Sequence, residues 1–265
     1  MYGPLTLAFK YLRYWLTAAN GKGHGVHSPF VFEFITRVLN DKRRFYAFDG
    51  IEKIRTQLLS NHSTIEIQDF GAGSRVAKTN TRKVSDVAKG SLKPAKYSQL
   101  LFRMIDYYGP AQIMELGTSL GITTAYLASA NTNAKVTTFE GSATIAQIAR
   151  QNHGSLGLAN ISLLEGNFDD QLPKWLAHNK KVDFAFIDGN HAYKPTIAYF
   201  EALLDVVEDH SILVFDDIHW SREMEAAWAQ ISAHPRVTLS IDLFFIGIVF
   251  FRKEFAQKQQ VSIRF

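Results

Sequence analysis

From Gln112 onward the sequence alternates short apolar runs with stretches of helical periodicity, and this alternation constrains the fold more than any other feature. The apolar runs are rich in β-branched and aromatic residues, which favour strands. Strands that alternate with helices at this spacing predict a parallel sheet covered by helices on both faces. The expected strands are Gln112–Leu116, Lys135–Phe139, Ile161–Leu164, Val182–Asp188 and Ser211–Phe215, and the expected helices are Ile122–Ala130, Ala143–His153, Asp170–His178, Thr196–Val207 and Ser221–His234.

The end of the chain has a different pattern. Its segment RVTLSIDLFFIGIVFFRKE contains two extended runs with a turn expected around Phe244–Gly247. Two strands joined by so short a connection must pair antiparallel. We therefore expect the parallel sheet to finish in an antiparallel hairpin.

The first hundred residues show no such repeat. They predict the helices Pro29–Leu39, Ile51–Leu59 and Tyr97–Tyr107 around a polar, basic segment, Gly71–Lys93. The pair His24 and His27 has a spacing that could suit a metal, but Ser28-Pro29 after it is typical of a helix start. We expect two domains, a helical and basic N-terminal extension over residues 1–96 and a ligand-binding α/β domain over residues 97–265.

The charge of the chain is uneven. Residues 1–100 carry 16 Lys and Arg against 7 Asp and Glu, whereas acidic residues exceed basic ones in the remainder. A basic extension could face an anionic substrate or a nucleic acid, and a solvated surface is the alternative. The absence of cysteine excludes disulfides, thiolate metal sites and cysteine nucleophiles.

No apolar run approaches the roughly 18 residues of a membrane span. Lys10 and Arg13 interrupt the first twenty residues where a signal peptide would be apolar. These residues predict an amphipathic helix that rests on the body of the protein, on a partner subunit or on a membrane surface. We expect a cytoplasmic protein, with a homodimer as one option for its assembly.

A glycine-containing loop follows the first strand of the repeat, in Glu115-Leu-Gly117-Thr-Ser-Leu-Gly121. Its glycines permit a tight turn and a close approach of backbone to ligand. It lacks the three-glycine dinucleotide pattern and the Lys-Ser/Thr of a phosphate-binding loop, so we expect a nucleoside without phosphates. Glu140 ends the next strand about twenty residues later, where a carboxylate can accept hydrogen bonds from ribose hydroxyls; a helix cap is the alternative.

A similar stretch, Ile67–Arg75, reads IQDFGAGSR. Polar and basic residues follow it, without the helix, strand and acid that a nucleoside loop requires, so its glycines predict a turn. The basic segment after it is a candidate lid that contacts substrate through Arg75, Lys78 or Arg82, and a plain surface loop is the alternative.

Carboxylates also end two further strands. Asp188 ends FAFID and is followed by Asn190 and His191, while Asp216 and Asp217 end ILVFDD. If these strands are neighbours, the three carboxylates converge and repel one another unless a cation lies between them. Oxygen ligands alone suit Mg²⁺, Mn²⁺ or Ca²⁺. In the alternative interpretation Asp217 caps a turn and Asp188 binds only the cofactor.

On these residues the chain resembles the class I S-adenosylmethionine-dependent methyltransferases. More narrowly, it is similar to the metal-dependent small-molecule O-methyltransferases of the catechol, caffeoyl-CoA and macrolide-sugar types. The resemblance covers about Gln99–Arg252. It implies a Rossmann-like sheet of seven strands, parallel with an antiparallel C-terminal hairpin, S-adenosylmethionine as cofactor, and a small molecule as methyl acceptor.

The resemblance also implies roles for individual residues. The metal ligands would be Asp188, Asp216 and Asp217, with Mg²⁺ as the first candidate ion. The cofactor would be held by Glu115, Gly117, Thr118, Gly121, Thr123, Glu140, Asn167, Phe168 and Asp188.

Two departures bear on the substrate. Catechol-type enzymes carry Asp-Asn where this chain has Asp216-Asp217, and a lysine base where it has His191. The macrolide-sugar branch is similar to the present pattern, which favours an alcohol-type hydroxyl. In the implied mechanism the metal at Asp188 lowers the pKa of the bound hydroxyl and His191 takes the proton. A loop histidine bonded to its own backbone is the alternative role for His191.

Other functions stay open. A nucleic-acid methyltransferase would draw on the basic extension, but the position after the fourth strand reads Asp188-Gly-Asn-His, without the prolines of base N-methyltransferases. Methylation of a hydroxyl group on RNA therefore stays open as an alternative. A non-catalytic methyltransferase-like scaffold is another, and the loop pattern disfavours an NAD-dependent reductase.

Overall fold

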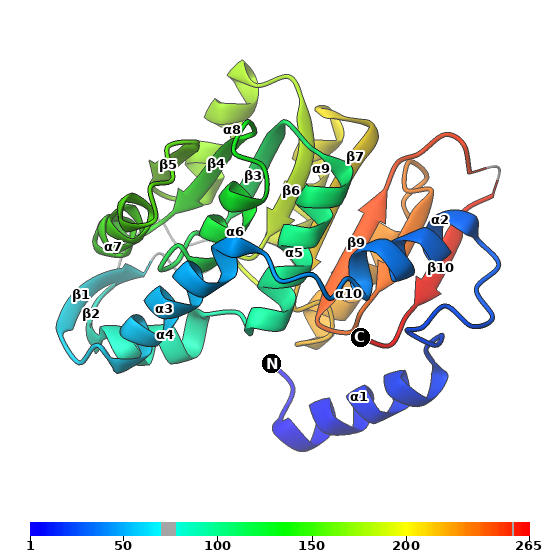
Figure 1. Cartoon of the computed structure of the whole chain (residues 1–265), viewed down its shortest axis with the longest axis horizontal. Coiled ribbons are helices and arrows are strands. Elements are labelled where there is room, and N and C mark those ends of the chain that lie inside the picture. Colours follow the sequence, from blue (N-terminus) through cyan, green and yellow to red (C-terminus); the bar gives the residue numbers. More distant parts are fainter. Residues whose placement is uncertain (70–77, 256) are drawn as a thin grey trace. The chain divides into compact units, whose positions relative to one another are not determined.

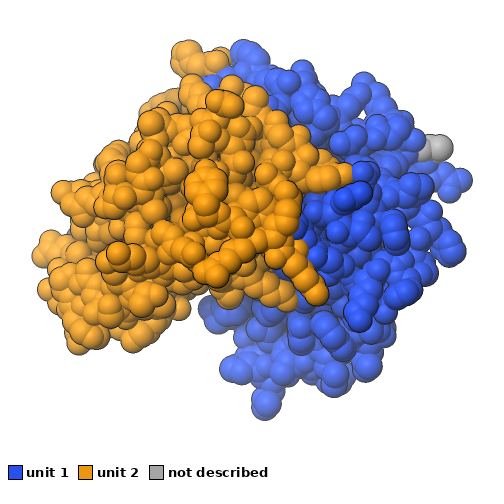
Figure 2. All heavy atoms as spheres, in the orientation of Figure 1, with its two compact units in different colours: residues 1–41, 179–265 blue, residues 42–178 orange. Residues whose placement is uncertain are grey.

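The structure is a computed structural model that describes residues 1–69, 78–255 and 257–265, with only the backbone of Gln68, Asp69, Lys78 and Thr79. The chain packs into two compact units, coloured separately in Figure 2. Unit 1 contains residues 1–41 and 179–265, and unit 2 contains residues 42–178. This packing does not follow the expected division between residues 96 and 97, which falls inside helix α5 (Ala95–Tyr108). The expected division into an extension (residues 1–96) and a ligand-binding domain (residues 97–265) therefore stays a prediction.

Unit 2 contains the first part of the predicted repeat (Figure 1). Its three strands pair in parallel, with β4 between β3 and β5. The strands are β3 (Gln112–Leu116), β4 (Lys135–Glu140) and β5 (Ile161–Glu165), and the helices that follow them are α6 (Ile122–Ala130), α7 (Ala143–Ser155) and α8 (Phe168–His178). All six elements confirm the predictions to within a few residues.

The core of unit 2 joins α3 (Tyr46–Ser60) to α5 and α6. Phe48 of α3 and Phe102 of α5 meet edge to face at 5.0 Å, and Tyr126 of α6 packs 5.3 Å from Phe48. Residues Ile122 to Ala128 of α6 are buried, because this helix is covered by neighbours around its whole circumference. Such a helix needs no polar face, which explains its apolar sequence.

The basic segment contains structure that the sequence did not predict. Strand β1 (Thr64–Asp69) pairs antiparallel with β2 (Lys78–Lys83), and α4 (Val84–Ser91) follows. Ile65 and Ile67 alternate with polar residues, a short period-two pattern that fits one half-buried strand. The turn predicted at the glycines of Ile67–Arg75, and Arg75 itself, lie outside the described residues.

Unit 1 contains the remaining strands in the order β6-β7-β9-β8-β10. β6 pairs in parallel with β7, and β7, β9 and β8 pair antiparallel in succession, which confirms the predicted hairpin. β10 pairs in parallel with β8 and adds one strand to the seven predicted. The strands are β6 (Val182–Ile187), β7 (Val207–Asp216), β8 (Leu239–Asp242), β9 (Ile246–Phe250) and β10 (Gln259–Ser262).

The helices of unit 1 begin where the sequence indicates. Ser221 caps α10 by accepting a hydrogen bond from the Met224 amide at 3.1 Å, and Pro29 occupies the first turn of α2. The helices are α1 (Pro4–Thr17), α2 (Pro29–Glu33), the π-helical η1 (Phe34–Leu39), α9 (Tyr193–Leu204) and α10 (Arg222–Ala233). Among the described residues, no helix combines the length and apolar character needed to span a membrane. The alternation of helices with mainly parallel strands confirms the predicted α/β class.

Candidate cofactor and metal sites

The loop after β3 has a backbone that only glycine adopts easily. Gly117 and Gly121 have φ angles of 102° and 80°, and Ser119 between them has 49°. A Cβ atom at Gly121 would also collide with the ring of His153. The amides of Gly117 and Thr118 donate to the Phe139 carbonyl oxygen at 3.1 and 3.0 Å, which fixes the loop on β4. The loop is therefore preformed, and glycine is required at its last position by both conformation and space.

Two side chains of helix α7 form hydrogen bonds to carbonyl oxygens of this loop. His153 Nε2 lies 3.0 Å from the Gly121 carbonyl oxygen, and burial lowers the pKa of His153 to about 4. The ring is thus neutral at physiological pH and donates its Nε2 proton to that carbonyl. Asn152 Nδ2 donates to the Leu120 carbonyl oxygen at 2.8 Å. The sequence did not single out these two side chains; an Asn-His pair in the last turns of an otherwise ordinary helix was the only signal.

Glu115 lies fully buried beneath the loop. Its Oε2 accepts hydrogen bonds from Thr124 and from Thr138, the latter at 2.7 Å. Burial raises the pKa of Glu115 to about 7, although both threonine hydrogen bonds oppose the rise. Its Oε1 has no hydrogen-bond partner among the described residues. Any contact between Glu115 and a cofactor would have to use this second oxygen.

The predicted cofactor threonines are also nearly covered. Thr118 is buried and its Oγ1 lies 2.6 Å from Oγ1 of Thr138, which connects the loop to Glu115 through β4. Thr123 in the first turn of α6 is 9% exposed. The side chain of Thr118 thus connects the loop to β4 through Thr138, which the sequence did not indicate.

Glu140, at the end of β4, holds the loop from its other side. Its Oε2 accepts from the Ser119 amide at 2.8 Å and its Oε1 accepts from the Ser142 amide at 2.9 Å. Burial raises its pKa, while these backbone donors lower it. Each carboxylate oxygen has a further lone pair. Glu140 can therefore accept hydrogen bonds from these backbone amides and from ribose hydroxyls at the same time.

The adenine candidates lie at the end of β5. Asn167 starts α8, because its Oδ1 accepts from the Asp169 amide at 3.0 Å and its carbonyl oxygen from the Gln171 amide at 2.9 Å. Phe168 is the first residue of that helix. The ends of β3, β4 and β5 thus place all of the cofactor candidates of unit 2 at one edge of three adjacent parallel strands, where open α/β sheets bind ligands.

In unit 1 the structure brings together Asp188, His191 and Asp216. Asp188 follows β6 and Asp216 ends β7, and because these strands are parallel neighbours their ends meet at one edge. One ligand atom from each of the three side chains lies within 4.8 Å of the others. His191 Nε2 is 3.5 Å from Asp188 Oδ1. Two carboxylates and an imidazole at this separation could hold a divalent cation.

Asp217 does not join this group, and no other His, Asp or Glu in the described part of the chain does. Its φ angle is 53°, and its carbonyl oxygen accepts from the Trp220 amide at 2.9 Å, which closes a turn. This contact is compatible with the alternative interpretation, in which Asp217 caps a turn, and that interpretation stays a prediction. Among the described side chains the group within this distance therefore contains His191 and not Asp217, and the assignment of Asp217 as a ligand stays a prediction.

The loop that carries His191 is fixed by a tyrosine that the sequence did not indicate. Asn190 has a φ angle of 52°, and its Nδ2 donates to the hydroxyl oxygen of Tyr199 in α9 at 2.5 Å. Tyr199 is buried. The left-handed Asn190 and its hydrogen bond position the turn between Asp188 and His191.

His219, two residues after Asp217, is not a member of this group. Its Nε2 lies 2.7 Å from Asp242 Oδ2, its Nδ1 lies 3.2 Å from Glu225 Oε1, and its ring stacks on Phe244. Burial lowers its pKa, but the two carboxylates outweigh that effect and raise it. His219 therefore holds packed elements of unit 1 together.

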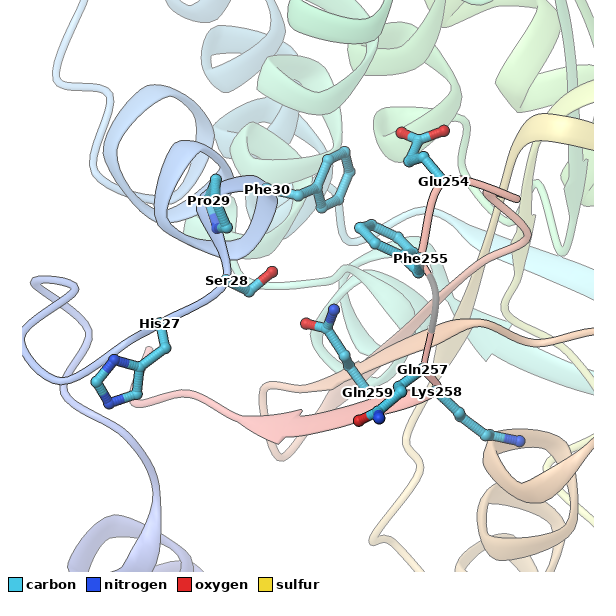
Figure 3. A pocket seen from close by; sticks show the side chains of 9 residues that line it. All are labelled: His27, Ser28, Pro29, Phe30, Glu254, Phe255, Gln257, Lys258 and Gln259. Carbon is cyan, nitrogen blue, oxygen red and sulfur yellow. The ribbon is translucent and has the colours of Figure 1, made fainter.

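A separate hollow of about 680 Å³ lies beside the start of α2 (Figure 3). Phe30 and Phe255 meet there edge to face, 5.3 Å apart. It is lined by none of the residues predicted for cofactor, metal or catalysis, and His24 and His27 belong to no ligand group among the described residues. Its lining is His27, Ser28, Pro29, Phe30, Glu254, Phe255, Gln257, Lys258 and Gln259.

Comparisons with known proteins agree with this architecture. Residues 114–218, less than half of the chain, match a family described as a methyltransferase domain. No curated protein matches the chain. The matched range runs from β3 to just beyond Asp216, so it includes both candidate sites.

Solved structures resemble between 61% and 96% of this chain. The SAH-bound methyltransferase PaMTH1 from Podospora anserina is 13% identical, with a TM-score of 0.60 over 96% of this chain and 98% of its own. An O-methyltransferase from Bacillus cereus in complex with SAH is 20% identical, with a TM-score of 0.55 over 83% of this chain and 97% of its own. The O-methyltransferase TomG from Streptomyces achromogenes, in complex with SAM, is 18% identical, with a TM-score of 0.54 over 61% of this chain and 82% of its own. At these identities the likeness establishes the fold, which is the one predicted.

Proposed function

Because the chain carries a methyltransferase domain, we propose that it is an S-adenosylmethionine-dependent O-methyltransferase that acts on a hydroxyl of a small molecule. The observation that carries the proposal is the set of three adjacent strand ends in unit 2. They present a preformed glycine loop, the anchored carboxylate of Glu140 and the Asn167 turn along one edge. The similar structures from Podospora anserina, Bacillus cereus and Streptomyces achromogenes contain SAH or SAM, which supports the same cofactor here.

The residues present fit a nucleoside cofactor. The left-handed turn at Gly117 and Gly121 leaves no side chain between loop and ligand, and Glu140 retains lone pairs for ribose hydroxyls. Phe168 offers an aromatic ring for adenine. When bound, S-adenosylmethionine supplies a methyl group on a sulfonium centre that a nucleophilic oxygen can attack. The contacts of Thr118 and Ser119 with Phe139, Thr138 and Glu140 of β4 support the loop in this conformation.

The residues of unit 1 also fit a divalent cation. Asp188 and Asp216 supply carboxylate oxygens, and Asp216 is buried, so a cation would offset the cost of its charge. Mg²⁺ or Mn²⁺ suits these oxygens, and such an ion lowers the pKa of a coordinated hydroxyl. We assign His191 as the base, because a partly exposed imidazole beside Asp188 can accept a proton near neutral pH.

The assignment of His191 has a direct competitor, in which its imidazole is the third ligand. A nitrogen that coordinates a metal cannot at the same time take a proton. The two roles differ in what His191→Asn would do. As a base, its loss abolishes methyl transfer and spares Mn²⁺ binding; as a ligand, its loss weakens both by an order of magnitude or more.

Isothermal titration calorimetry with S-adenosylhomocysteine tests the cofactor site. Glu140→Gln should weaken binding about tenfold or more, because it removes charge-assisted acceptors for the ribose. Glu165→Gln is a matched control, since Glu165 ends the neighbouring strand and forms an exposed ion pair with Arg150. No binding by the unaltered protein, or equal losses in both variants, would refute the cofactor proposal.

Transfer of radioactive methyl from S-adenosylmethionine to a panel of alcohols, sugars and catechols tests the reaction. Transfer that needs added Mg²⁺ or Mn²⁺ and is lost in Asp216→Asn supports the proposal. Transfer to RNA instead, with salt-sensitive RNA binding, would support the RNA alternative. Cofactor binding without transfer to any acceptor would support the scaffold alternative.

A further inference from the structure

Helix α1 has two apolar faces, and only one of them is covered within unit 1. On the inner face, Tyr14 and Ala18 are buried against Phe244, with Leu7 and Tyr11 beside them. The Tyr14 hydroxyl donates to the Ile263 carbonyl oxygen. These contacts confirm the first of the three predicted alternatives for the amphipathic helix, in which it packs on the body of the protein.

Polar contacts hold the same face in place. Lys10 Nζ lies 2.9 Å from Glu225 Oε1, and the Tyr2 hydroxyl donates to Glu225 Oε2 at 2.7 Å. The Ala19 amide after the helix donates to the Ser262 carbonyl oxygen at 2.8 Å. Since both ends and one face are fixed, α1 cannot rotate its other face inward without losing these contacts.

The other face is apolar and exposed. Leu5, Phe9, Leu12 and Leu16 recur at intervals of four, three and four residues and therefore form one stripe along the helix. Their exposed fractions are 88%, 71%, 55% and 69%. Trp15, which is 43% exposed, flanks the stripe. A continuous stripe of this kind marks an interaction surface, unlike scattered single apolar residues.

The charged side chains of α1 and of the segment that follows it up to residue 32 are all basic. The first acidic residue of the chain is Glu33, and the exposed Arg13 and Lys22 precede it. The Arg264 guanidinium lies over the ring of Trp15, 5.7 Å from its centroid. The acid that contacts α1, Glu225, is already paired with Lys10. The surface therefore complements an anionic, apolar partner.

We propose that the outer face of α1 binds the surface of a membrane containing anionic lipids. The stripe would enter the boundary between headgroups and acyl chains, Trp15 would lie at the interface, and Arg13, Lys22 and Arg264 would meet lipid phosphates. The helix is about 21 Å long at 14 residues, so it lies in the surface and does not cross the bilayer.

A second copy of the chain fits this face less well. Two symmetry-related α1 helices would bring the same basic side chains together with no acid on the helix to balance them. A face about 21 Å long and about 10 Å wide also falls short of the roughly 800 Å² per partner of a stable complex. Charge and area both favour the lipid surface.

Sedimentation of the full-length protein with vesicles tests the proposal. Binding to mixed phosphatidylglycerol–phosphatidylcholine vesicles should exceed binding to pure phosphatidylcholine by about tenfold or more, and salt should weaken it. The double variant Phe9→Gln/Leu12→Gln should lose about tenfold or more of this binding. Arg13→Gln/Lys22→Gln should lose the preference for phosphatidylglycerol. Tyr46→Gln, which removes an 82% exposed aromatic ring from α3, should bind as the unaltered protein does.

Thermal unfolding checks that the outer-face variants remain folded, as expected for exposed side chains. No binding to phosphatidylglycerol vesicles, or equal binding by the Phe9→Gln/Leu12→Gln variant, would overturn the proposal. So would a dimer that this variant separates into monomers, because a second copy would then cover the stripe. S-adenosylhomocysteine binding should be unchanged in all of these variants, so the result is independent of the proposed enzymatic function.

Discussion

The buried carboxyl group of Glu115 makes the stability of the protein depend on pH in a way that one substitution should remove. Burial raises its pKa from an ordinary value of 4.5 to about 7 in the folded state. Below pH 4.5 the group is protonated in both states and costs nothing. Between pH 4.5 and 7 the unfolded chain releases the proton while the folded protein retains it, so stability falls as pH rises.

The size of the effect follows from the pKa difference. One pKa unit is equivalent to about 1.4 kcal/mol, so above pH 7 the ionised Glu115 destabilises the folded protein by roughly 3 kcal/mol. Glu115→Gln has the same shape, and its amide oxygen can accept the hydrogen bonds of Thr124 and Thr138. The variant should match the unaltered protein near pH 4.5 and exceed it by about 3 kcal/mol at pH 8.

Urea unfolding followed by circular dichroism, without cofactor, measures this difference across the pH range. Glu140 also titrates, and its charge helps to raise the pKa of Glu115, so the same comparison is made in a Glu140→Gln background, while Glu165→Gln controls for the loss of an exposed carboxylate. A stability difference between Glu115→Gln and the unaltered protein that stays constant from pH 4.5 to 8 would refute the buried-charge account. A variant that is less stable at pH 4.5 as well would show the cost of burying an amide nitrogen at the position of Oε1, which has no partner among the described residues, and the pH-dependent part of the difference would then be the test.

Three further predictions concern single positions. Gly121→Ala should destabilise the protein by about 2 kcal/mol or more in urea unfolding, because its φ angle is positive and His153 occupies the space of a Cβ atom, whereas Gly154→Ala, with open space around it, should be neutral or stabilising. Asp216→Asn should weaken Mn²⁺ binding in calorimetry about tenfold or more, and Asp217→Asn should weaken it less; the reverse order would restore Asp217 as a ligand. Ser221→Ala should cost about 1 kcal/mol in the same unfolding assay through loss of the α10 cap, and no change would show that the cap is redundant.

The sequence determined most elements of the repeat because burial leaves a strong local signal. β9 is buried on both faces and appears as an unbroken apolar run, and β6 appears as an apolar run interrupted only by Asp183. Ser221 marks the start of α10. The polar strand β2 and the short strand β10 carry no such signal. β2 pairs with β1 and β10 pairs with β8, and neither strand was predicted.

The candidate sites also have features that the sequence predicted and features that it did not. The positions of Glu140 and Asp188 at strand ends could be read from the sequence, because a strand boundary is a local property and parallel strands end at a common edge. Which of His191 and Asp217 lies closest to Asp188 and Asp216, in the candidate metal group, could not be read from the sequence. It depends on the left-handed backbone at Asp217 and on the Asn190–Tyr199 hydrogen bond, which follow from how the loops pack.

By itself, then, the sequence determined the α/β alternation, the glycine loop and the residues at the strand ends, since each rests on neighbours in the chain. Only the tertiary structure decided which side chains are buried and which converge. It buried Glu115 and raised its pKa, placed His153 against Gly121, and left one face of α1 exposed. Burial and convergence depend on contacts between segments far apart in sequence, and no local pattern specifies them.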